Sequence, residues 1–65
     1  MEEIEKLRVL IPHWIEHNGE HAAEFRQWAA RAGVAQADLM AAADALEAAN
    51  KSLQAALEKL GGAKG

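Results

Sequence analysis

Apolar residues follow an unbroken spacing of alternating three and four positions through the first half of this chain. Such a spacing places them on one stripe of an α-helix that packs lengthwise against another helix. The stripe consists of Ile4, Leu7, Ile11, Trp14, Asn18, His21, Phe25, Trp28 and Ala32, so two of its members, the asparagine and the histidine, are polar. The pattern predicts a first helix over about residues 2–32.

A strict seven-residue repeat of leucines marks the second half of the chain. A heptad repeat of this kind is typical of a helix with one continuous packing stripe. The repeat consists of Leu39, Leu46, Leu53 and Leu60, and Ala43, Asn50 and Leu57 take the other positions of the stripe. We therefore predict a second helix over about residues 36–60.

Glycines mark the expected ends of both helices. Gly33 follows the first stripe and can take the left-handed conformation that commonly ends a helix. Gly61 and Gly62 end the second helix in the same way, and residues 63–65 are expected to fray. Together these features predict one all-α domain over residues 1–65, folded as an antiparallel helical hairpin.

Pro12 is the difficult position of the first helix. An interior proline has no N–H for the carbonyl of Arg8 and clashes with it. Two structures are compatible with this: a kinked helix, or a short helix that ends before a second one starts with Pro12 in its first turn. Because the apolar spacing continues unbroken through Pro12, we predict the kink. Gly19, beside Asn18, is expected to permit close approach of another backbone.

The antiparallel arrangement also predicts which residues face one another. With the turn at Gly33, facing residue numbers sum to about 68. Asn18 then lies opposite Asn50, and His21 lies opposite Leu46 and Glu47. We expect a polar layer in the middle of the hairpin, between apolar layers at either end.

A hairpin of two helices covers only one stripe of each. A single core is marginal in a domain of 65 residues, and Leu10 and Ile15 form an uncovered second flank. We predict that a second copy covers this flank in a homodimeric four-helix bundle; docking of an amphipathic helix from another protein is the alternative. Residues expected in the core or at the oligomer contact are Trp14, Asn18, Phe25, Trp28, Leu46 and Leu53.

Composition argues against several classes of function. Seven basic residues are outnumbered by ten acidic ones, which argues against a nucleic-acid partner. The acidic start is unlike a secretory signal peptide, and the longest apolar run is too short to span a bilayer. Ser52 is the only hydroxyl-bearing residue, and there is no cysteine. We predict a cytoplasmic protein with no membrane partner and no enzymatic activity.

Three histidines within nine residues suggest a metal site. His17 and His21 are four positions apart, so on a helix their imidazoles can bind one divalent ion together. Without cysteine, nitrogen and oxygen ligands favour nickel, cobalt, zinc or copper(II). The predicted ligands are His17, His21, His13, Glu20 and Glu24, with Glu47 and Asn50 as possible ligands from the facing helix. On this hypothesis the domain serves as a metal accessory, chaperone or sensor domain.

The same residues allow a purely structural interpretation. Asn18, His21 and Asn50 on packing stripes resemble the buried polar residues that set register and oligomeric state in helical bundles. His13 and His17 would then be ordinary surface residues. This alternative is a homo-oligomerisation or protein-interaction module that binds no metal.

The run from Leu7 to His21, LRVLIPHWIEHNGEH, resembles a small prokaryotic helical domain with an L-P-H-W-I-E-H-N-x-E-H signature. That domain is similar to segments found alone or beside small nickel-binding proteins of the CooT type. The resemblance implies handling of nickel or cobalt, nickel foremost, and a metalloprotein partner. The matching motif positions are His13, His17, Glu20 and His21.

Overall fold

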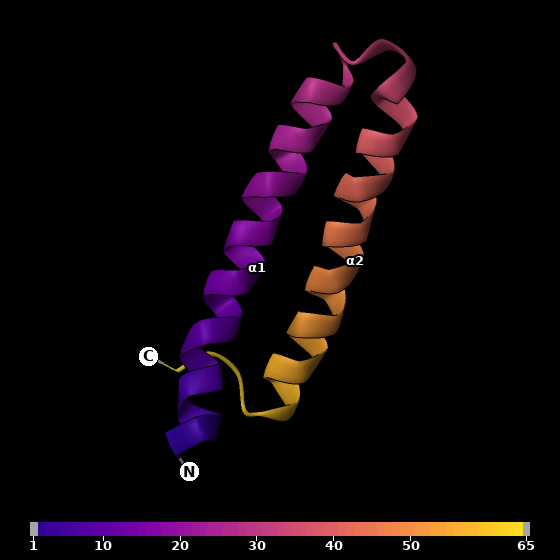
Figure 1. Cartoon of the computed structure of the whole chain (residues 1–65). Coiled ribbons are helices and arrows are strands. Elements are labelled where there is room, and N and C mark those ends of the chain that lie inside the picture. Colours follow the sequence, from indigo (N-terminus) through magenta and orange to yellow (C-terminus); the bar gives the residue numbers. More distant parts are fainter. Residues whose placement is uncertain (1, 65) are drawn as a thin grey trace.

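The chain folds as an antiparallel helical hairpin. A computed structural model describes residues 2–64; Met1 and Gly65, the last residue of the predicted frayed tail, lie outside the described part. Helix α1 spans Glu2–Ala29 and helix α2 spans Gln36–Lys59, with a short 3₁₀ helix, η1, at Gly33–Ala35 between them. The two long helices lie side by side and run in opposite directions (Figure 1), in a shape 48 Å long and about 15 Å across. The all-α hairpin prediction is confirmed.

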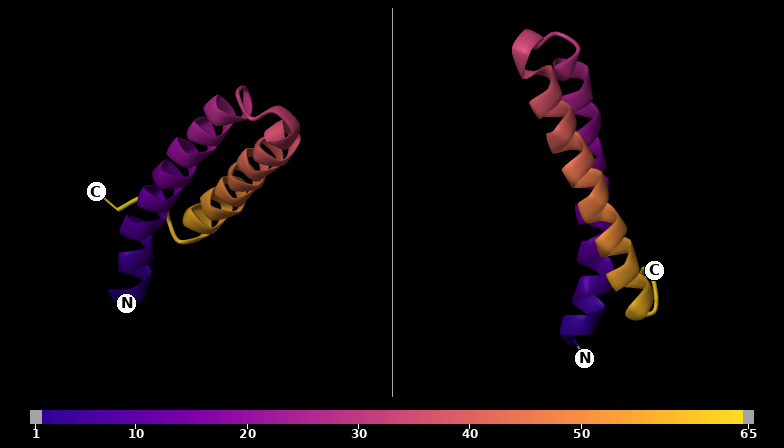
Figure 2. Two further views of the ribbon diagram at one scale, coloured as in Figure 1. Left: turned by 45° about the horizontal axis from the view of Figure 1, so that its top comes forward. Right: turned by 90° about the vertical axis from the view of Figure 1, so that its right-hand side faces the viewer.

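Helix α1 continues through Pro12 without a break. The alternative of a separate lead-in helix is therefore wrong. In the left view of Figure 2, the first turns of α1, drawn in indigo, run in a different direction from the rest of the helix. A change of direction is expected there, because Pro12 cannot donate to the carbonyl of Arg8 one turn earlier.

Helix α1 ends at Ala29, three residues before the predicted end at position 32. The Arg31 N–H donates to the carbonyl of Trp28 (2.9 Å), and the Ala32 N–H donates to that of Ala29 (3.1 Å). Hydrogen bonds between residues three apart tighten a last turn and end the regular helix. Gly33 then takes φ +57°, the left-handed conformation expected of it.

Helix α2 ends at Lys59 in a glycine motif, one residue before the predicted end. The Gly62 N–H donates to the carbonyl of Leu57 (2.9 Å), and the Gly61 N–H donates to that of Glu58 (3.1 Å). Gly61 has φ +102°, which a residue with a side chain rarely adopts. This pair of hydrogen bonds is the Schellman arrangement, and it satisfies carbonyls that the helix end leaves free.

The segment after α2 is docked on α1, which contradicts the predicted frayed tail (Figure 1). The Lys64 N–H donates to the carbonyl of Arg8 (3.2 Å), the acceptor that Pro12 leaves without its helical donor. In return, Arg8 Nε donates to the carbonyl of Gly62 (2.8 Å), and Lys64 Nζ pairs with the carboxylate of Glu5. The proline thus creates the acceptor that holds the tail.

The core of the hairpin is small. Among residues 2–64, only two buried side chains are large, and the other three are alanine methyl groups that let the helices approach closely. The buried residues are Ile11, Ala22, Ala29, Ala43 and Leu57. Leu46, Leu53 and Phe25 are half-buried beside this core. The prediction that the tryptophans belong to the core is wrong for the hairpin alone, because Trp14 is 43% and Trp28 is 59% exposed.

A pair of asparagines joins the middle of the two helices, as the predicted register requires. Asn18 Nδ2 donates to Asn50 Oδ1 (3.1 Å), and Asn50 Nδ2 donates to the backbone carbonyl of Ile15 (3.0 Å). Because a polar group between helices is favourable only when it is hydrogen-bonded, this pair favours one register over its neighbours.

Gly19 does not serve a close backbone contact, contrary to expectation. It is exposed, and a Cβ added there would meet nothing within 4 Å. We expect Gly19→Ala to stabilise the fold by about 0.5–1 kcal/mol, since alanine loses less backbone entropy in a helix. Thermal unfolding followed by circular dichroism should show a rise of about 4 °C in Tm.

Gly33→Ala is the matched control, because a Cβ there also meets nothing within 4 Å but φ is +57°. This variant should lower Tm, since a side chain is disfavoured in the left-handed region. A fall in Tm for Gly19→Ala would show that Gly19 has a role that the isolated hairpin does not reveal.

Candidate functional site

The histidines lie on the exposed surface of α1. The ring centroids of His17 and His21 are 5.9 Å apart, with a tilt of 53° between the rings, and His21 also lies 6.2 Å from the ring of Phe25. All three histidines are exposed, with His13 one turn nearer the N-terminus than His17. Two imidazoles at this separation can reach one ion with small side-chain rotations, because metal–nitrogen bonds are about 2.0–2.1 Å long.

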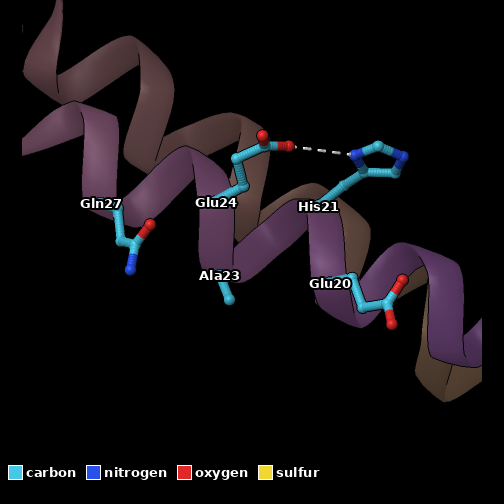
Figure 3. A pocket seen from close by; sticks show the side chains of 5 residues that line it. All are labelled: Glu20, His21, Ala23, Glu24 and Gln27. Atoms are coloured by element: carbon cyan, nitrogen blue, oxygen red, sulfur yellow. Dashed lines mark hydrogen bonds and ion pairs between the residues drawn. The ribbon is translucent and has the colours of Figure 1, made fainter.

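Glu24 contacts His21 rather than standing beside it as a free ligand. Its Oε1 lies 3.4 Å from His21 Nδ1, and the two side chains reach toward one another in Figure 3. A carboxylate at Nδ1 orients an imidazole and leaves its Nε2 for another ligand. Glu20 points away from this pair in Figure 3, although both glutamates border the same shallow surface hollow.

The residues predicted to complete the site from α2 do not face the histidines. Glu47 Oε1 accepts a hydrogen bond from Arg26 Nη2 (2.7 Å), which also donates to Oδ1 of Asp44 (2.9 Å). The hydrogen bond to Asp44, and after it the hydrogen bond to Glu47, raises the pKa of the Arg26 guanidinium above its ordinary value. Both polar atoms of the Asn50 amide are also engaged, one with Asn18 and one with the α1 backbone. The rule that facing residue numbers sum to about 68 predicted how far along the hairpin each residue lies, but not the direction in which its side chain points around the helix axis.

Within residues 2–64 of a single chain, no group of three or more histidine, aspartate or glutamate side chains is placed to hold a metal ion. His17 and His21 are therefore a pair that lacks further ligands. A four-coordinate zinc site normally needs three or four protein ligands. One chain offers at most half of such a site.

The Arg26 ion pairs identify one face of the hairpin, and the opposite face is apolar. Trp28 follows Arg26 by two positions, which turns it about 160° away around the helix axis. Leu46 follows Asp44 by the same interval, so Trp28 and Leu46 share the face opposite the ion pairs. Residues a turn or whole heptads away extend this apolar face, which we define as Leu10, Trp14, Trp28, Leu46 and Leu53.

Large side chains on the apolar face are exposed to solvent. Leu10 is 42%, Trp14 is 43% and Trp28 is 59% exposed, whereas Leu46 and Leu53 are half-buried. Ile15 does not belong to this face, contrary to the predicted flank. It lies about 140° round the helix from Leu10, and its carbonyl accepts the hydrogen bond from Asn50.

Comparison with known proteins identifies one family. Its model, described as a domain of unknown function, DUF8180, matches residues 7–60 and so includes all of α2, α1 from its sixth residue onward, and every histidine. No curated protein and no solved structure matches the chain significantly. Over the described residues, neither helix combines the length and the apolar character that crossing a membrane requires.

Proposed function

The chain belongs to the DUF8180 family, a domain of unknown function, and we propose from its surface that it is a self-association module. Two copies pack their apolar faces together and form a four-helix bundle. The observation that carries this proposal is the exposure of Trp14, Trp28 and Leu10 on one face, opposite the ion pairs of Arg26. Exposed aromatic and aliphatic side chains on one face are a feature of association surfaces. The proposed activity is association rather than catalysis.

The accessible surface area of one chain is large enough to supply an interface with a second copy. The accessible surface is 4772 Å² for a chain of 7.0 kDa, whereas a compact monomer of that mass exposes about 4,000 Å². The excess of about 700 Å² is close to the area of about 800 Å² that each partner buries in a standard interface. A stable dimer therefore needs about the area that this hairpin has in excess.

Four of the five residues of the apolar face are arranged symmetrically, which favours a second copy over an unrelated partner; Trp14 is the exception, since Glu24 occupies its symmetric position. On α1, Gly19 lies midway between Leu10 and Trp28. On α2, Leu46 and Leu53 lie either side of Ala49 and Asn50, and Asn50 is level with Asn18 through their hydrogen bond. One two-fold axis at this level would place Leu10 against Trp28 of the second copy and Leu46 against Leu53 of the second copy.

Sedimentation equilibrium of the metal-free protein tests the proposal. We expect a species of twice the 7.0 kDa chain mass. Trp28→Glu should give a monomer, because a buried interface tryptophan contributes about 2 kcal/mol or more and each dimer loses two of them. The dimer Kd should rise about 1,000-fold. Trp14 lies two heptads before Trp28 on the same face of α1, so Trp14→Glu should also give a monomer.

Val9→Glu is the matched control. Val9 is 44% exposed, as Trp14 is 43% exposed, but it lies about 140° round the helix from Trp14. This variant should remain a dimer, and circular dichroism should show that all three variants keep their helices. A metal-free parent chain that sediments as a monomer would contradict the proposal and favour a different protein as the partner of this face.

A further inference from the structure

We propose that two copies of the chain together bind one divalent transition metal, through His17 and His21 of each copy. This inference rests on the proposed dimer. One hairpin offers the imidazoles of His17 and His21, and within its residues 2–64 no third imidazole or carboxylate is placed to hold an ion together with them. A second copy supplies the same pair again by symmetry, so the dimer contains four imidazole ligands.

The histidine pair lies where the proposed dimer would form. His21 is one heptad from Trp14 and one heptad from Trp28, so it stands in the row of tryptophans on the apolar face. His17 precedes it by one turn, and their rings are 5.9 Å apart. The side chain of His21 is 54% exposed in the hairpin, which leaves it accessible to groups from a second copy.

The proposed two-fold axis crosses α1 at the same height along the helix as the pair His17 and His21. Gly19 lies midway between His17 and His21, just as it lies midway between Leu10 and Trp28. A two-fold axis at this level runs the two α1 helices antiparallel and places His17 opposite His21 of the second copy. The register that pairs Leu10 with Trp28 of the second copy therefore also gathers the four imidazoles of His17 and His21.

The ligand chemistry selects the class of metal. The site offers imidazole nitrogens, and the chain has no cysteine, so a divalent ion of the zinc, nickel, cobalt or copper type fits it. Glu24 acts as a positioning residue: its carboxylate, 3.4 Å from His21 Nδ1, favours the tautomer whose Nε2 binds the ion. Calcium and magnesium, which prefer oxygen ligands, should not compete.

Calorimetric titration of the metal-free protein with zinc tests this site. We expect saturation at one zinc per two chains. His17→Ala and His21→Ala should each weaken zinc binding by more than 10-fold, and Glu24→Gln by about 10-fold with its dimer intact. His13→Ala is the matched control, since this exposed histidine lies a further turn from the symmetry level, and its zinc affinity should equal that of the parent.

The stoichiometry and the sedimentation result separate this inference from the proposed dimer. A metal-free dimer that takes up one zinc per chain, or that binds zinc equally well in the His17→Ala and His21→Ala variants, overturns the shared site alone. A parent chain that is monomeric without metal contradicts the proposed dimer, whatever it binds. The Trp28→Glu monomer provides the converse check, because it keeps every histidine and should still lose tight zinc binding.

Discussion

Leu57→Ala should lower the stability of the fold by about 3 kcal/mol and Tm by roughly 15 °C. Leu57 is 5% exposed, and Ile11 is the only other large side chain among the buried residues described. Truncating it removes one of these two large side chains and leaves a cavity in a small core. A domain of 65 residues has a total stability of only about 3–10 kcal/mol, so a large part of the population should unfold.

Thermal unfolding by circular dichroism measures this loss, at one fixed protein concentration because association, as proposed above, makes Tm depend on concentration. Val34→Ala is the control: Val34 is fully exposed in η1, and its truncation should change the stability by less than about 0.5 kcal/mol. Equal Tm values for the two variants would show that the layer of Leu57 and Ile11 is not the core.

Pro12→Ala should raise the stability of α1 and release the tail at the same time. Alanine is about 3 kcal/mol more favourable than proline inside a helix. Its N–H can donate to the carbonyl of Arg8, which in the parent accepts the N–H of Lys64 at 3.2 Å. The helical donor competes with Lys64 for this carbonyl, and loss of the tail hydrogen bond costs about 1 kcal/mol. We expect a net gain of about 2 kcal/mol.

Two measurements separate these effects. Tm reports the stability, and amide hydrogen exchange of Lys64, followed by NMR, reports the tail, with exchange expected to become faster in the variant. Pro12→Gly is the matched control, because it restores the same N–H with about 1 kcal/mol less helix propensity than alanine. Both variants should release the tail, and the glycine variant should gain less in Tm. Unchanged protection of the Lys64 amide in both would contradict the link between Pro12 and the tail.

Much of the fold was predictable because it depends on local preferences and on spacing. Apolar spacing predicted both helices and their antiparallel pairing, and the hydrogen bond from Asn18 to Asn50 confirms the predicted register. The spacing also argued correctly for a continuous helix through Pro12. The early end of α1 and the docked tail were missed, since both depend on individual backbone hydrogen bonds that no spacing pattern contains.

The candidate site was less predictable because direction around a helix decides it. Numbering placed Glu47 level with His21, yet the structure turns Glu47 toward Arg26 on the opposite face. The signal that could have shown this is the charge of Arg26 itself, which lies within reach of Asp44 and Glu47 in the same register. For Trp14 and Trp28, membership of the packing stripe did not distinguish burial inside the hairpin from exposure on its surface.

The sequence by itself determined the helices, their pairing and the position of the three histidines along α1, because periodicity and glycine and proline chemistry act over a few residues. Only the tertiary structure decided which side chains share a face. It showed that Arg26 pairs with Asp44 of α2 and that the tryptophans stay uncovered on the opposite face. It also showed that, among residues 2–64, no third histidine or carboxylate is placed to hold a metal ion with His17 and His21. The physical reason is that a face forms between two helices at once, and its members depend on how each helix is rotated about its axis.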